Sequence, residues 1–142
     1  NSGTHVYFKE HVLRKGDPAG KEEFAPGALL LSSSQAIADE VTGNSAAIGY
    51  YGMGYISSKQ KPIAVAKDEK AEYVTPLIEN VLNGTYPISR PLFLYTNGEP
   101  KDLVKKFVDF TLSKEGQEIV LATDFVPVKN ERIADSVERR EK

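Results

Sequence analysis

The chain opens with the stretch NSGTHVYF, residues 1–8, in which a small hydroxylated turn runs directly into a segment with helical periodicity. Thr4, Phe8 and Val12 recur every four residues, which predicts one apolar face of a helix. Ser2 or Thr4 is suited to cap this helix, because a short side-chain oxygen there accepts a hydrogen bond from a first-turn backbone amide.

The same turn has features of an anion-binding site. Gly3 carries no Cβ, so the backbone can come close to a ligand. The first amides of a helix point outward, and the helix dipole adds about half a positive charge at this end. The hydroxyls of Ser2 and Thr4 add neutral donors. We therefore expect Ser2, Gly3 and Thr4 to form half of a site for an oxyanion. The alternative is a turn that only caps the helix.

The composition is that of an ordinary globular protein, and it disfavours some classes of binding partner. A chain of 142 residues suits one domain or two small lobes. The net charge of −2 argues against broad nucleic-acid binding, which depends on concentrated Lys and Arg. With no cysteine there is neither a disulfide nor thiolate chemistry, which fits any compartment. A chain that starts without a signal-peptide pattern or an initiator methionine is expected to be processed or a fragment.

Periodicity and turn residues predict alternating strands and helices, which is the α/β class. We expect strands at residues 28–31, 46–51, 62–66, 92–96 and 125–128. We expect helices at the start of the chain, at 35–41 closed by Gly43 or Asn44, from Thr75-Pro76 to Asn83-Gly84, from Pro100 to about 112, at 114–122, and in the tail 130–142. Serine caps are expected before residue 35 and at Ser113.

Further motifs follow the opening turn in a fixed order. They are Ser34-Gln35-Ala36-Ile37, Ala47-Ile48-Gly49-Tyr50, YPISRPLF at 86–93 and FTLSKEGQ at 110–117. From residue 1 to about 128, this series resembles the phosphate-binding proteins of bacterial ABC-type phosphate importers, which have the type II periplasmic binding-protein fold.

The resemblance implies two α/β lobes that hold an anion in the cleft between them. It implies phosphate contacts from Ser2, Gly3 and Thr4, with no catalysis, cofactor or metal. It assigns residues 1–88 to the second lobe, 89–128 to a segment returning to the first lobe, and 129–142 to a charged helical tail. It also implies ABC permease subunits as partners and a periplasmic or extracellular location, at the membrane through the transporter. Phosphonate or another tetrahedral oxyanion remains an alternative ligand.

One departure from the family pattern concerns the N-terminal side. The family has an arginine a few residues before Ser-Gly-Thr and a further part of the first lobe, whereas this chain starts at Asn1. The resemblance therefore implies the C-terminal part of a larger protein. The face of Leu103, Phe107 and Phe110 is expected to be covered, by the missing N-terminal part as a separate chain or by a swapped copy.

Other interpretations stay open from the residues alone. One is a hydrolase or transferase that uses the turn as an oxyanion site, with His5 as base. Another is a sensor or adhesion module without solute binding. His5 and His11 lie about 600° apart on a helix, which disfavours a shared metal site. Arg90 is interpreted as a structural ion pair where the lobes cross, and Tyr50, Tyr51 and Tyr55 as core and rim residues.

Overall fold

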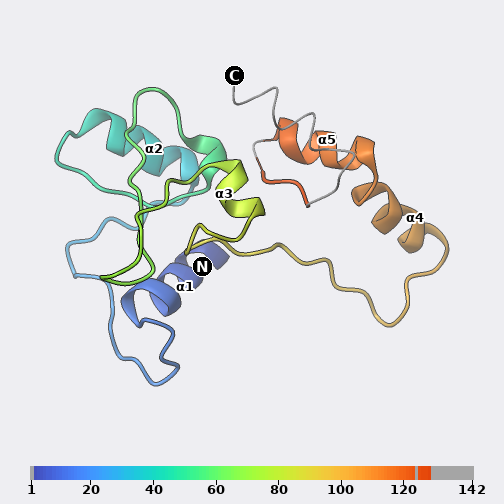
Figure 1. Ribbon diagram of the computed structural model, residues 1–142, viewed down its shortest axis with the longest axis horizontal. Coiled ribbons are helices and arrows are strands. Elements are labelled where there is room, and N and C mark those ends of the chain that lie inside the picture. Colours follow the sequence, from blue (N-terminus) through green and yellow to red (C-terminus); the bar gives the residue numbers. More distant parts are fainter. Residues whose placement is uncertain (1, 124, 129–142) are drawn as a thin grey trace.

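The computed structural model describes residues 2–123 and 125–128, and its described part is built from helices and extended segments (Figure 1). The elements in chain order are α1 (Gly3–Phe8), η1 (Lys9–Leu13), α2 (Ser34–Gly43), η2 (Met53–Tyr55), α3 (Ile78–Leu82), α4 (Asp102–Thr111) and α5 (Lys114–Ala122). Of these, η1 is a π-helical turn and η2 a 3₁₀ turn. A long extended segment leads from the α1–α3 half of the molecule to α4 and α5 (Figure 1).

Helix α1 begins where the sequence predicted. Ser2 has an extended backbone, and its Oγ accepts a hydrogen bond from the backbone N of His5 at 3.1 Å. This is the geometry of an N-cap, so Ser2 rather than Thr4 caps the helix. Helix α1 continues without a break into η1, which ends at Leu13.

Helix α2 packs on an extended segment through a glycine. Ser33 caps the helix by accepting from the backbone N of Ala36 at 3.1 Å, which confirms a serine cap. A Cβ built on Gly49 would lie 2.7 Å from Cγ2 of Ile37 and 3.0 Å from Cγ2 of Val41. The helix can approach this closely only because residue 49 has no side chain. The helix ends at Gly43, as expected, but neither Gly43 nor the C-cap residue Asn44, whose φ is −128°, has the left-handed conformation common at helix ends.

Helix α3 is shorter than predicted. It begins at Ile78 after Leu77, whereas Thr75-Pro76 was expected to start it. The backbone N of Leu77 and the side-chain amide of Asn80 both donate to the Thr75 carbonyl, so the preceding turn stays outside the helix. The helix ends as expected at Asn83-Gly84, where Gly84 has a φ of +75°.

Helices α4 and α5 form a tight pair. The Oγ of Ser113 accepts from the backbone N of Gly116 at 3.2 Å, which confirms the predicted cap of α5. Gln117 is only 3% exposed and holds the connection through both ends of its amide. Its Nε2 donates to the Thr111 carbonyl at 2.7 Å, and its Oε1 accepts from the Val128 amide at 2.7 Å. Helix α4 begins at Asp102, two residues after the predicted opening at Pro100.

The predicted strands are the main correction. Within residues 2–123 and 125–128 the five expected segments form no strand, and the ladder pairing seen there is one antiparallel bridge between Val65 and Val74. Residues 92–96, one of the expected strands, are extended and exposed, with Tyr95 91% exposed. A strand needs a neighbour to take up its backbone hydrogen bonds, and in the described structure only the segment at 62–66 has one, through the single bridge of Val65.

The apolar face of α4 is also uncovered. Leu103 is 78% exposed and Phe107 61% exposed, and Phe110 is likewise an exposed aromatic. The expectation that this face is buried is therefore not met by the described residues. The small core instead joins the two halves, where Ile78 of α3 packs against the buried Leu121 of α5.

The remaining helix predictions concern the C-terminal tail and the membrane. The helix predicted for residues 130–142, and the charged tail assigned to 129–142, lie outside the described residues. Among the described helices, none combines the length and the apolar character that crossing a bilayer requires.

Candidate functional site

The structure places Ser2, Gly3 and Thr4 together at the exposed start of α1. The first amides of a helix have no acceptor within the helix. Ser2 Oγ takes the amide of His5, which leaves those of Gly3 and Thr4 for an outside acceptor. The Ser2 hydroxyl still holds its proton for donation. The Thr4 hydroxyl has no hydrogen-bond partner among the described residues. The turn therefore presents hydrogen-bond donors to solvent, namely the two free amides and the two hydroxyls, for which the described residues supply no acceptor.

An aromatic cluster holds α1 in place behind this turn. The rings of Phe8 and Tyr50 stack at 4.0 Å between centroids, and those of His5 and Phe24 at 4.7 Å. Nδ1 of His5 also lies 3.0 Å from the hydroxyl of Tyr50. Burial in this cluster raises the pKa of the Tyr50 phenol. The helix start is thus fixed to two segments far away in sequence, around residues 24 and 50.

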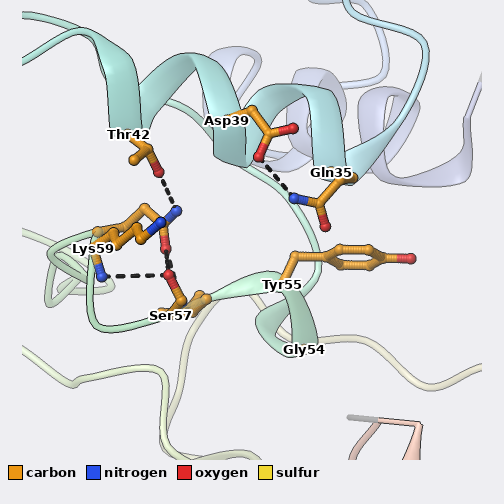
Figure 2. A pocket seen from close by; sticks show the side chains of 9 residues that line it. Gln35, Asp39, Thr42, Gly54, Tyr55, Ser57 and Lys59 are labelled. Atoms are coloured by element: carbon orange, nitrogen blue, oxygen red, sulfur yellow. Dashed lines mark hydrogen bonds between the residues drawn. The ribbon is translucent and has the colours of Figure 1, made fainter.

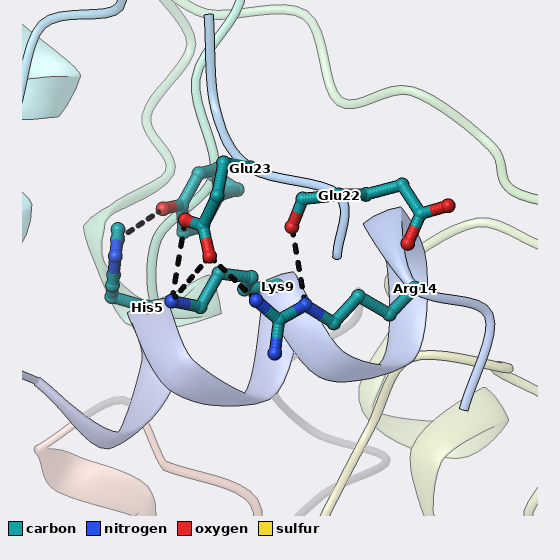
Figure 3. Close-up of polar contacts among 6 residues, drawn as sticks. His5, Lys9, Arg14, Glu22 and Glu23 are labelled. Atoms are coloured by element: carbon teal, nitrogen blue, oxygen red, sulfur yellow. Dashed lines mark hydrogen bonds and ion pairs between the residues drawn. The ribbon is translucent and has the colours of Figure 1, made fainter. Parts of the chain in front are cut away.

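Ion pairs on the same helix involve one shared carboxylate (Figure 3). Glu23 lies 3.3 Å from Nζ of Lys9 and 2.5 Å from Nη2 of Arg14. Nε of Arg14 also donates to the carbonyl of Glu22 at 3.1 Å. These contacts fasten the loop that follows η1 back onto the helix. They also place both cations, Lys9 and Arg14, against a single negative charge.

Arg90 lies beside the predicted site residues, which the sequence analysis did not foresee. The ion pairs of the described residues do not include it, so the predicted structural ion pair is not found in that part of the chain. Its guanidinium instead lies beside Gly3, where a Cβ would come within 2.7 Å of Nη2. The signal that could have pointed to it is the glycine, which leaves room for another group at that position.

A cavity of about 400 Å³ lies elsewhere, between α2 and the segment around η2 (Figure 2). Its polar groups largely bond to one another: Gln35 donates to Asp39 at 2.8 Å, and Gln60 donates to Thr42 at 2.5 Å. The residues that line it are Gln35, Asp39, Thr42, Gly54, Tyr55, Ile56, Ser57, Lys59 and Gln60. None of the three predicted site residues lines this cavity.

The described residues around His5 do not form the catalytic arrangement that the hydrolase interpretation requires. A serine or threonine nucleophile needs a base that a third group orients. In the described part of the chain, the partner of the His5 ring is the hydroxyl of Tyr50, and no carboxylate hydrogen-bonds to it. The same residues contain no group of three His, Asp or Glu side chains that could hold a metal ion.

Comparison with known proteins identifies the family to which the chain belongs. The chain belongs to the family described as the PBP superfamily domain, which it matches over residues 1–115. It is 38% identical over 131 residues to the "Phosphate-binding protein PstS" of Pseudomonas aeruginosa, covering 89% of this chain and 39% of that protein.

Two further relatives match a similar share of the chain. The chain is 29% identical over 132 residues to the "Phosphate-binding protein PstS 2" of Streptococcus pneumoniae, covering 92% of this chain and 43% of that protein. It is 32% identical over 134 residues to "Protein SphX" of Synechococcus elongatus, covering 90% of this chain and 37% of that protein. The chain thus spans about two fifths of the length of these relatives. The family resemblance inferred from the motifs is confirmed at the level of the PBP superfamily.

Proposed function

We propose that this chain forms a phosphate-binding part of a solute-binding protein that serves an ABC importer, and that it is not an enzyme. The observation that carries the proposal is the exposed start of α1, where Ser2, Gly3 and Thr4 present hydroxyl and amide donors. Relatives named for phosphate binding support phosphate as the oxyanion. Neutral and dipolar donors of this kind suit an anion that is held away from water.

In this proposal the chain supplies only part of the cleft that holds the anion. Residues 1–88 would form the second lobe of a type II fold, residues 89–128 would return toward the first lobe, and 129–142 would form a charged tail. The rest of the first lobe, from the same protein or from a swapped copy, would close over the anion. That partner would also cover the exposed face of Leu103 and Phe107 and pair with the extended segment at 92–96. Delivery to permease subunits places the protein in the periplasm or outside the cell, at the membrane through the transporter.

The test is calorimetric titration of inorganic phosphate into the intact protein and its Thr4→Val variant. Valine keeps the shape of the threonine side chain and removes the hydroxyl donor. Loss of a hydrogen bond to a charged ligand should weaken phosphate binding by at least about 1.5 kcal/mol, close to tenfold. Sulfate is titrated in parallel to establish which tetrahedral anion is preferred.

A matched control is Thr111→Val. The Thr111 hydroxyl lies on α4 and donates to the carbonyl of Phe107 at 2.9 Å, so it is engaged within its own helix. Phosphate affinity should not change in this variant. Equal affinities for the wild type and Thr4→Val would contradict the role of Thr4. Turnover of a phosphate ester that Ser2→Ala abolishes would instead support an enzyme.

A further inference from the structure

The starting observation is a close approach between residues 87 positions apart in the chain. Gly3 and the guanidinium of Arg90 lie against each other, so that a Cβ on residue 3 would come 2.7 Å from Nη2 and 3.6 Å from Cζ. Contacts under 3 Å of this kind do not occur without displacement of one partner. Residue 3 therefore has to be glycine for the guanidinium to stay where it is.

The position of Arg90 is fixed by a second contact with the same helix. Its Cζ lies 5.4 Å from the centroid of the Tyr7 ring, which is within the range of a cation–π interaction. The hydroxyl of Tyr7 donates to the carbonyl of Ser89 at 3.0 Å, next to Arg90 in the chain. The ring of His11 also stacks on Tyr7, with 4.1 Å between the ring centroids. Tyr7 thus anchors both the backbone and the side chain of the 89–90 segment.

The charge of Arg90 is also uncompensated in the described structure. Lys9 of η1 and Arg14, which directly follows η1, share the carboxylate of Glu23 (Figure 3). None of the ion pairs or hydrogen bonds found among residues 2–123 and 125–128 involves the Arg90 guanidinium. An exposed guanidinium, held in place without a carboxylate, is available to an anion from outside.

We propose that Arg90 is an affinity-determining residue of the phosphate site, where it supplies the formal positive charge beside the donors of Ser2, Gly3 and Thr4. This inference rests on the proposed function. A charge-assisted contact from a guanidinium is roughly twice as strong as a neutral one, and its planar fork matches the oxygens of a phosphate. Gly3 then has two tasks: it offers its amide, and it leaves space for the guanidinium.

The experiment titrates inorganic phosphate calorimetrically into the intact protein at several NaCl concentrations. Arg90→Gln removes the charge, and Arg90→Lys keeps a charge without the planar fork. Lys106→Gln is the control, because Lys106 is an exposed cation of α4 that makes no ion pair among the described residues. Gly3→Ala tests the close approach, since the added Cβ must displace the guanidinium.

Arg90→Gln is expected to weaken phosphate binding about tenfold or more and to flatten its salt dependence, because a charged contact is lost. Arg90→Lys should recover part of the affinity and the salt dependence, while Lys106→Gln should bind like the wild type. In the Gly3→Ala background, Arg90→Gln should add little further loss.

Wild-type affinity and salt dependence in Arg90→Gln would overturn the role of Arg90 and leave the proposed function intact. Equal losses in Arg90→Gln and Arg90→Lys, with an unchanged salt dependence, would overturn it too, because the residue would then act only by packing on Tyr7. If the wild-type protein binds no phosphate, both the proposed function and this inference fail.

Discussion

The packing of α2 against Gly49 leads to the prediction that Gly49→Ala destabilises the protein. The substitution adds one methyl group at a position where Cγ2 of Ile37 and Cγ2 of Val41 lie 2.7 and 3.0 Å from the new atom. The ring of Tyr51 lies on a further side at 3.6 Å. The new Cβ therefore meets atoms of two residues from one helix, and α2 must move outward to admit it.

The magnitude follows from two opposing terms. Overpacking of this kind costs about 1–3 kcal/mol of folding free energy. Alanine also reduces the conformational entropy of the unfolded chain, which offsets about 0.4–1 kcal/mol of that cost. The net expectation is a loss of about 1–2 kcal/mol in the free energy of unfolding. Gly27→Ala is the matched control, because its Cβ would meet no atom within 4 Å. That variant should be neutral or slightly more stable than the wild type.

Urea unfolding of the intact protein, followed by circular dichroism, measures these differences from the midpoint and slope of each transition. The double variant Val41→Ala/Gly49→Ala tests the cause, because it removes one of the two methyl groups in the clash. Its destabilisation should be smaller than the sum of the two single effects by about 0.5 kcal/mol or more. The reasoning is refuted if Gly49→Ala is as stable as Gly27→Ala, or if the two substitutions at 41 and 49 are simply additive.

Two other predictions concern the α4–α5 pair and alkaline pH. Gln117→Leu should destabilise the protein by about 1–3 kcal/mol, since it leaves the Thr111 carbonyl and the Val128 amide without their partner. Faster hydrogen exchange at the Val128 amide would report the loss of that contact, and unchanged exchange would contradict it. Burial raises the pKa of the Tyr86 phenol above its ordinary value near 10, so the neutral form is favoured in the folded state. The stability that this group contributes is fully present below pH 10 and is lost as the pH rises through the raised pKa. Tyr86→Phe should therefore show a smaller loss of unfolding free energy between pH 9 and 11 than the wild type, and equal pH profiles would contradict the assignment.

The sequence by itself determined features whose cause is local. It identified the starts of three helices at Ser2, Ser33–Ser34 and Ser113, because an N-cap depends on a side chain and on amides two or three residues away. The order of short motifs also indicated the family, which the match over residues 1–115 confirms. The three candidate site residues lie within one turn, so their proximity followed from their positions in the chain.

The tertiary structure decided everything that depends on a distant partner. Apart from the single bridge at Val65, the expected strands remain unpaired in the described residues, because a strand forms only where another strand accepts its backbone hydrogen bonds. The apolar face of α4 remains exposed for a similar reason, since periodicity shows which face is apolar but not what covers it. Only the folded chain brings Arg90 across Tyr7 to Gly3. That contact joins segments far apart in sequence, and no local pattern of residues specifies it.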